Sequence, residues 1–172
     1  MSIREIEQRD PSEVTQATLL IVLRNNGQEM LLAMKKRGFA TGKWNAPGGK
    51  QHPGEDIKET AARETEEEVK IKTSHLIKVA VLRFGFPKDP DKIGWNQDVH
   101  VFIANKWTGE AIETEEMRPE WYRVNEIPYS EMWEDDILWL PRVLTGEKLK
   151  AVFIFGEDNK MKSYKIQKVN NL

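Results

Sequence analysis

The chain has 172 residues, 39% of them hydrophobic and 31% charged, with a formal net charge of −2 and no cysteine. This length suits one domain with a substantial core, and the weak net charge excludes the dense basic face that binding to a nucleic-acid backbone requires. The lack of cysteine excludes disulfides, thiolate metal sites and cysteine nucleophiles, while a charged N-terminal stretch and the lack of a long apolar run lead us to expect a cytoplasmic enzyme or binding domain.

The first third of the chain predicts a polar extension, a strand hairpin and a long loop. Residues 1–16 are mostly polar and are expected to precede a single domain over residues 17–172. The nearly continuous apolar run Ala17–Arg24 is typical of a buried strand, and Glu29–Lys35 follows an Asn-Asn-Gly turn as the second arm of a hairpin. The loop over residues 37–54 holds five glycines and two prolines, a composition more often functional than decorative.

The rest of the chain predicts one long helix among a series of strands. Apolar periodicity predicts the helix from about Asp56 to Lys70. Strands are expected over residues 75–86, 98–107 and 118–124, a short helix interrupted by Pro141 over residues 132–144, and a final hairpin over residues 149–155 and 161–169. Strands on either side of helices, joined by hairpins and crossovers, predict an α/β fold with a mixed sheet and helices on both faces.

The predicted helix carries the first candidates for chemistry at the border of its buried stripe. That stripe consists of Ala61, Thr65 and Val69. The outer face already holds two glutamate–base pairs at the favourable i,i+4 spacing. Between the two faces lie Glu64, Glu67 and Glu68. These three carboxylates have no basic residue placed between them, so they need a separate explanation.

Two interpretations of the three carboxylates remain open at this point. Each like-charge pair at i,i+4 costs the helix roughly 0.2–0.5 kcal/mol, and a hard divalent cation such as Mg²⁺ or Mn²⁺, which prefers oxygen ligands, would reverse that cost. The glycines of the preceding segment Ala46–Gly49 would let a backbone carbonyl approach the same ion. The alternative is a solvated acidic face, in which Arg63 partly neutralises Glu67 one helical turn later.

The segment Gly49–Ile71 resembles the Nudix box, which reads Gly, five residues, Glu, seven residues, Arg-Glu, an aliphatic residue, any residue, Glu-Glu, any residue, Gly and an aliphatic residue. The matching residues are Gly49, Glu55, Arg63, Glu64, Glu67, Glu68 and Ile71. Two positions depart from the motif. Thr65 replaces the aliphatic residue, which a packed position tolerates if the hydroxyl bonds back to the helix, and Lys70 replaces the glycine that usually ends the helix in a left-handed turn.

This resemblance implies a Nudix α/β/α sandwich and a divalent-cation-dependent pyrophosphohydrolase, with Mg²⁺ as the cofactor and Mn²⁺ as an alternative. By the resemblance, Glu64 and Glu68 would ligate the metal together with the carbonyl of Gly48. Glu67 would be a further metal ligand or the base that activates water, and Arg63 would orient the glutamates.

The similarity extends over roughly residues 18–169 and is closest to the MutT-related enzymes that hydrolyse oxidised purine nucleoside triphosphates to monophosphate and pyrophosphate, cleansing the nucleotide pool. The segments that carry it are Met34–Phe39, Lys43–Asn45, Gly48–Lys50, Asp98–Phe102, Glu116–Pro119 and Met132–Asp136. The substrate-binding residues that the resemblance implies are Lys35, Phe39, Asn45, Phe84, Met117, Trp133, Asp135 and Asp136. Among them, Asn45 and the two aspartates would hold the base edge, and Glu116 would lie near the metal site.

Chemistry that does not depend on the family supports a base pocket near Trp133. A purine needs stacking surface and a few placed hydrogen-bonding groups, and Trp133 stands beside Asp135 and Asp136 in the sequence. Adjacent carboxyl groups in a dry pocket need not both be ionised, so one is able to donate while its neighbour accepts. The alternative is an acidic helix N-terminus that complements the helix dipole.

Other functions stay open from the sequence. Hydrolysis of another nucleoside diphosphate derivative, such as ADP-ribose or a dinucleoside polyphosphate, is one rival, and a non-catalytic module that binds nucleotide is another; the intact glutamates argue against the second. We expect a monomer that acts on a small nucleotide, with no nucleic-acid polymer and no membrane as partner. The loop over residues 87–97 is longer than usual for the family, and Gln97 stands where a methionine is expected, so both should affect base preference.

Overall fold

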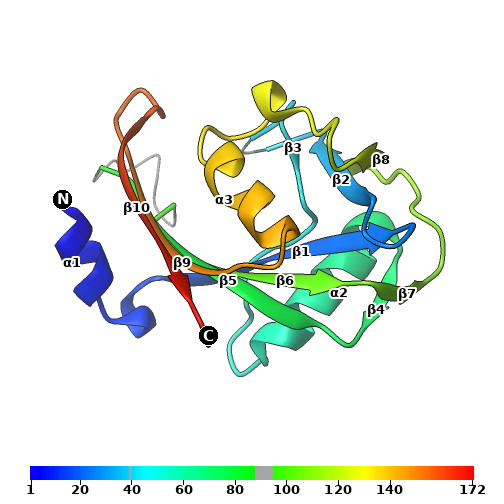
Figure 1. The fold of residues 1–172 in the computed structure, drawn as a ribbon, viewed down its shortest axis with the longest axis horizontal. Helices are drawn as coiled ribbons and strands as arrows, with labels where there is room; N and C mark the ends of the chain where they lie inside the picture. The colour runs from blue at the N-terminus through cyan, green and yellow to red at the C-terminus, as the bar shows by residue number, and fades with distance from the viewer. Residues whose placement is uncertain (39, 88–94) are drawn as a thin grey trace.

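The computed structural model describes residues 1–38, 40–87 and 95–172, and its centre is an eight-stranded mixed sheet (Figure 1). The strands of this sheet are β1 (Thr15–Arg24), β2 (Glu29–Lys35), β3 (Trp44–Asn45), β5 (Ile77–Gly85), β6 (Gln97–Ala104), β8 (Met117–Arg123), β9 (Lys148–Phe155) and β10 (Met161–Val169). A small separate sheet pairs β4 (Lys72–Ser74) with β7 (Lys106–Thr108). The helices are α1 (Ile3–Gln8), α2 (Ile57–Val69) and α3 (Asp136–Leu144), with 3₁₀ turns η1 (Pro11–Glu13) and η3 (Tyr129–Glu131).

The strand order is β10-β9-β5-β6-β1-β2-β3, with β8 paired to β2. β1 runs parallel to β6 and β5 runs parallel to β9, whereas the other neighbours in the sheet are antiparallel. The prediction of a mixed sheet with hairpin and crossover links is therefore confirmed. Residues 1–16, expected as an extension, form α1 and η1 and then supply the first two residues of β1.

The hairpin β1–β2 pairs at two positions only, Leu23 with Met30 and Arg24 with Glu29. Beyond them the glycine-rich loop takes the place of a strand neighbour along β1. The amide of Leu20 donates to the carbonyl of Pro47 at 2.8 Å, and the amide of Thr18 donates to the carbonyl of Gly49 at 2.9 Å. The loop is thereby fixed against the middle of the sheet.

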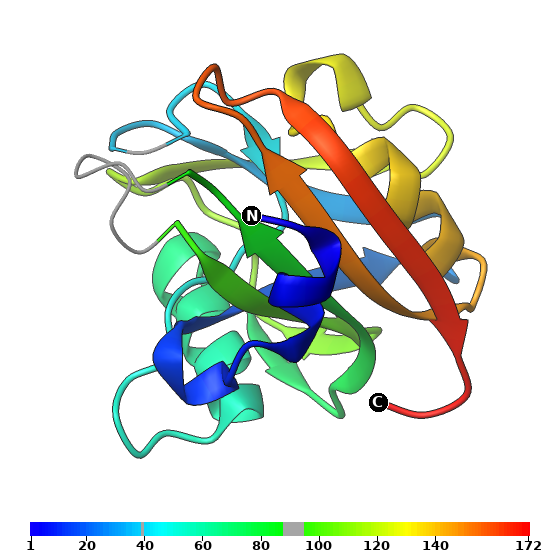
Figure 2. The ribbon, with the colours of Figure 1, turned by 90° about the vertical axis from the view of Figure 1, so that its left-hand side faces the viewer.

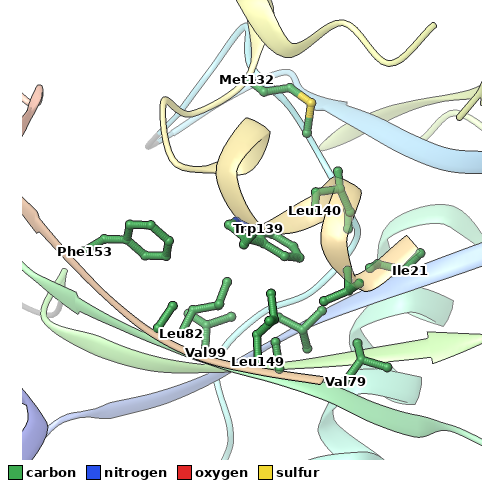
Figure 3. Close-up of a cluster of buried hydrophobic side chains, with 14 of the residues drawn as sticks. Ile21, Val79, Leu82, Val99, Met132, Trp139, Leu140, Leu149 and Phe153 are labelled. Carbon is green, nitrogen blue, oxygen red and sulfur yellow. The ribbon is translucent and has the colours of Figure 1, made fainter. Parts of the chain in front are cut away.

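Helices cover both faces of the sheet. α3 lies on one face, where Trp139 and Leu140 pack over Leu82, Val99 and Phe153 in the largest apolar cluster (Figure 3). α2 and α1 lie on the opposite face, α2 over β1 and β6 and α1 over β5 and β9 (Figures 1 and 2). None of the helices in the described part of the chain combines the length and the hydropathy of a membrane span.

The carboxylate helix α2 agrees closely with its prediction. Asp56 caps it by accepting a hydrogen bond from the amide of Lys58, and the predicted stripe packs against β1 and β6. The hydroxyl of the fully buried Thr65 donates to the carbonyl of Ala61 at 2.8 Å, the back-bond that makes a polar residue tolerable in this apolar position. Lys70 ends the helix at φ 64°, so the left-handed turn is kept without glycine.

Three expected elements differ from the structure. The strand predicted over residues 75–86 begins at Ile77, because His75 adopts φ 57° and turns the chain out of β4. The strand predicted over residues 98–107 is divided into β6 and β7 between Ala104 and Lys106. α3 begins at residue 136 rather than 132 and continues through Pro141, because the carbonyl that this proline leaves without a helical donor belongs to Ile137, on an exposed part of the helix.

The left-handed Lys70 generates a stability prediction. Because a side chain at φ 64° is strained and glycine is not, Lys70→Gly should raise the free energy of unfolding by about 0.5–1 kcal/mol. Urea denaturation measures this change. Lys70→Ala is the control, because it removes the exposed side chain and keeps the strain. A Gly variant no more stable than the Ala variant would contradict the interpretation.

Candidate active site

A pocket of about 260 Å³ opens where β1 and β2 diverge, between the glycine-rich loop and the start of α3. It brings together nine of the residues expected to bind substrate or metal: Lys35, Asn45, Gly48, Glu68, Phe84, Met117, Trp133, Asp135 and Asp136. These residues come from six separate segments of the chain. Phe39, which was also expected to bind substrate, lies outside the described residues.

Aromatic rings form one wall of the pocket. Phe86 stacks on Phe155 with ring centroids 5.0 Å apart and an interplanar angle of 12°, and Phe84 stacks on Phe153 at 5.6 Å. Trp133 meets the edge of Phe155 at 5.9 Å, and Trp95 meets Phe86 edge-on at 5.2 Å. Such a wall offers flat apolar surface of the kind that a heteroaromatic base needs for stacking.

The two aspartates at the start of α3 are buried to the same degree, each 2% exposed. A side-chain oxygen of Asp135 accepts from the indole N–H of Trp139 at 3.1 Å, and one of Asp136 accepts from the amide of Trp133 at 3.0 Å. Burial raises the pKa of Asp135 to about 6, and burial together with the neighbouring Asp135 raises the pKa of Asp136 well above its usual value. The pair is therefore disposed to keep a proton and to present a donor as well as acceptors.

Asn45 of β3 and Lys43, which precedes that strand, line the same pocket as this pair. The side-chain oxygen of Asn45 accepts from the amide of Ala46 at 2.8 Å, which leaves its NH₂ group as the donor available to a ligand. The ammonium of Lys43 donates to the carbonyl of Met132 at 3.1 Å and lies 5.4 Å from the ring centre of Trp133. Lys43 thus fixes the Trp133 segment to the β3 side of the pocket.

The other end of the pocket is acidic. Glu68 is 8% exposed, and its carboxylate accepts a hydrogen bond from the amide of Gly48 at 3.0 Å. Burial raises the pKa of Glu68 to about 7, with Glu64 and Glu116 adding to the rise and the Gly48 amide and Lys35 opposing it. This carboxylate is short of positive charge, which is the condition that a cation would relieve.

Arg63 joins the glutamates of α2 to the loop. Two nitrogens of its guanidinium donate to the carboxylate of Glu55, at 2.7 and 3.0 Å. The third nitrogen donates to Glu64 at 2.8 Å and to Glu67 at 3.2 Å. The hydrogen bonds from Arg63 are the largest cause that lowers the pKa of Glu55 to about 2. Glu64 is thereby held towards the pocket, whereas Glu67 stays 60% exposed.

The donor chemistry of this end suits a hard divalent cation. Oxygen atoms are available there from the carboxylates of Glu68 and Glu64 and from the backbone of Gly48, and within the described residues no donor bonds the carbonyl of Gly48. A side chain on Gly49 would overlap the Glu64 carboxylate, with 2.4 Å between a Cβ and the carboxyl carbon, so the loop backbone fits closely against α2. Among the described residues, no three acidic or histidine side chains lie close enough together to hold a metal ion in their present positions. Arg63 holds Glu67 at 3.2 Å, and Arg37 holds Glu116 at 2.8 Å.

Sequence reasoning missed several residues of the pocket: Lys43, Phe86, Trp95 and Phe155, while Gln97 was noted only for its identity. Phe86 had a signal, because it lies two positions after Phe84, directly after the end of β5, where the alternation of an extended chain turns both rings to one side. Trp95 and Phe155 had none, because each reaches the pocket from a distant segment. Arg63, Glu64, Glu67 and Glu116 do not line the pocket and lie beside its acidic end.

The NUDIX domain description matches residues 14–143. The chain is 39% identical over 158 residues to a protein of Danio rerio named oxidized purine nucleoside triphosphate hydrolase, covering 92% of this chain and 99% of that one. A protein of the same name from Mus musculus is 39% identical over 154 residues, covering 90% and 95%. The solved structure of a mutator MutT protein from Bacillus halodurans superposes with a TM-score of 0.76 at 27% identity, covering 90% of this chain and 98% of that chain.

The buried aspartate pair predicts a pH-dependent stability. A carboxyl whose pKa is raised by folding stabilises the folded state below its unfolded pKa of about 3.8, and that stability is lost as the pH rises through the higher folded pKa. Asp136→Asn should therefore gain stability over the wild-type protein as the pH rises from 4.5 to 8, by on the order of 1–3 kcal/mol. Urea denaturation at several pH values, without nucleotide or divalent cation, measures the difference.

The matched control is Asp158→Asn. Asp158 is exposed and hydrogen bonds from Lys162 and Lys160 lower its pKa, so its replacement should bring no gain at high pH. A stability difference between Asp136→Asn and wild type that stays constant with pH would show that the pair is not protonated in the folded protein.

Proposed function

Because this chain belongs to the Nudix family, we propose that it hydrolyses oxidised purine nucleoside triphosphates to the monophosphate and pyrophosphate, which would remove damaged nucleotides from the pool. The observation that carries the proposal is the buried pair Asp135–Asp136 beside an aromatic wall, at the opposite end of the pocket from Glu68. One end suits a base and the other suits a charged phosphate chain with its cation. The names of the two vertebrate relatives support the same substrate class.

The base end has the groups that purine selection requires. Oxidation of a purine at C8 adds a carbonyl oxygen and a proton on the neighbouring ring nitrogen, so it changes which positions donate and which accept. With one of the two carboxyl groups protonated, Asp135 and Asp136 would offer a donor and an acceptor, and Asn45 adds the donor described above. Buried groups of this kind discriminate strongly, because a mismatched base leaves one of them unpaired.

The acidic end has the residues to hold the cation and the water. The proposed ligands are the carbonyl of Gly48 and the carboxylates of Glu64, Glu67, Glu68 and Glu116, with Mg²⁺ as the cation and Mn²⁺ as an alternative. A bound cation of this type supplies polarisation of phosphate oxygens and of bound water. Lys35 lines the pocket near Glu68 and would bind a phosphate oxygen.

Glu67 is proposed either as a further ligand of the cation or as the base that activates water. Its exposed carboxylate is held by a single Arg63 nitrogen at 3.2 Å, so it is free to turn towards the pocket at small cost and there to bind the cation or to take a proton from the attacking water. Arg63 keeps its fork onto Glu55 when Glu67 leaves, so the loop and the helix stay joined.

The metal assignment predicts a specific pattern of activity loss. Glu67→Gln and Glu68→Gln should each lower kcat by about 10²–10⁴-fold, because each removes a charge needed at the reacting phosphate, and a chelator should abolish wild-type turnover. Glu66→Gln is the control: it lies on the outer side of the same helix, paired with Lys72 at 3.3 Å, and should leave kcat near wild type. Turnover that survives chelation would remove the assignment.

The substrate assignment is tested by a panel of oxidised and normal purine triphosphates, ADP-ribose and a dinucleoside polyphosphate. We expect the highest kcat/KM for an oxidised purine triphosphate, with monophosphate and pyrophosphate as products. Asn45→Ala should reduce the ratio of oxidised to normal purine kcat/KM by about 5–150-fold, the effect of 1–3 kcal/mol from one buried hydrogen bond. Release of diphosphate and inorganic phosphate, or a preference for ADP-ribose, would contradict the proposal.

A further inference from the structure

Residues 1–13, the N-terminal segment, precede the part of the chain that matches the NUDIX domain, which begins at residue 14. The segment is nevertheless packed firmly onto the sheet. Ile6 of α1 is 3% exposed and contacts Val152 and Ile154 of β9. Gly85 of β5 leaves room for it, because a Cβ at that position would lie 2.2 Å from the Ile6 side chain. The segment is thereby fixed against β5 and β9, on the sheet face opposite α3 (Figure 2).

Arg9, which follows α1, bridges the ends of two strands. One guanidinium nitrogen donates to the carbonyl of Phe84 at 2.8 Å, and the other donates to the carbonyl of Gln97 at 2.7 Å and to the carboxylate of Asp98. The Arg9 and Asp98 side chains are 13% and 3% exposed. Arg83 contacts the second oxygen of Asp98 at 3.6 Å, so a second arginine also holds the carboxylate to which Arg9 binds.

The two carbonyls that Arg9 bridges belong to residues of the pocket. Phe84 and Gln97 are direct partners across β5 and β6, at the last pair before the chain leaves the sheet, and both line the pocket. At this position the two carbonyls both accept, and the charged fork of Arg9 is the donor that holds them. The residues next along the chain, Phe86 and Trp95, complete the aromatic wall.

We propose that Arg9 is a positioning residue for the base pocket: by holding Phe84 and Gln97 at a fixed separation, it sets the fit of an oxidised purine base. This inference rests on the proposed function and deepens it. Phe84 supplies the ring, and Gln97 supplies the side-chain amide, a donor and an acceptor among aromatic groups. A residue of the N-terminal segment therefore contributes to base selection without touching the substrate.

A positioning role differs measurably from a purely stabilising one. Loss of the bridge should let Phe84 and Gln97 separate, which weakens base binding and leaves the carboxylates of α2 in place. KM for the oxidised substrate should then rise by roughly tenfold or more, with little change in kcat. Lysine has no fork and cannot span two carbonyls and a carboxylate, so Arg9→Lys should resemble Arg9→Ala. Added guanidinium ion should restore part of the affinity of Arg9→Ala.

The experiment compares Arg9→Ala and Arg9→Lys with two controls in the same segment. Arg4→Ala removes an exposed arginine of α1, and Ile6→Ala loosens the docking of α1 without removing the bridge. Steady-state kinetics with an oxidised and a normal purine triphosphate give the KM and kcat split. Titration of tryptophan fluorescence with purine nucleoside monophosphates, oxidised and normal, without divalent cation, reports base binding independently of chemistry, and thermal melting reports stability.

The expected result is weaker binding of the oxidised base and a reduced ratio of oxidised to normal affinity in both Arg9 variants, but in neither control. An unchanged ratio in both Arg9 variants, an equal loss in Ile6→Ala, or a fall in melting temperature alone would overturn the proposal. Wild-type protein without turnover of oxidised triphosphates would count against the proposed function, while the cation-free titration would still decide the role of Arg9. If Arg9→Ala does not fold, Arg9→Lys decides the outcome.

Discussion

The short pairing between β1 and β2 is the constraint from which the site follows. Because these strands separate after two residue pairs, the amides in the middle of β1 need other acceptors, and the carbonyls of Pro47 and Gly49 provide them. This pairing presses the loop backbone so close to the backbone of Thr18 that only glycine fits at position 48, and a side chain at position 49 would displace the Glu64 carboxylate. One packing requirement therefore opens the pocket and brings a backbone carbonyl beside the carboxylates of α2.

The pocket then buries carboxyl groups at both ends, and each end relieves the cost differently. Asp135 and Asp136 lie side by side in a dry environment, and burial raises the pKa values of both, so protonation removes part of the charge. Glu68 is less enclosed, and the amide of Gly48 and the nearby Lys35 compensate only part of its burial. A proton relieves the first end, and a cation is the natural counterpart of the second.

The success of sequence reasoning depended on how local each feature was. α2 was predictable because its apolar period, its Asp56 cap and its motif lie within one short segment. The turn at His75 was not predictable, because it follows a strand, β4, whose partner β7 lies far along the chain. Arg9 left no signal either, because two of its partners are backbone carbonyls, which any residue carries. Sequence reasoning found the pocket residues that the family resemblance identifies, and it missed those that only tertiary packing brings to the pocket.

The ion pairs around the acidic end are arranged so that weak contacts hold the groups that must move. Arg37–Glu116 and Arg63–Glu67 each involve a carboxylate that is more than half exposed, and exposed pairs of this kind contribute about 0–1 kcal/mol. Arg63–Glu55, by contrast, is a forked contact between two largely enclosed groups and keeps the loop joined to the helix. Glu68, whose charge burial leaves only partly compensated, lies near Glu64 and Glu116. Glu67 and Glu116 can therefore turn inward at little cost, whereas the parts of the framework that define the site stay where they are.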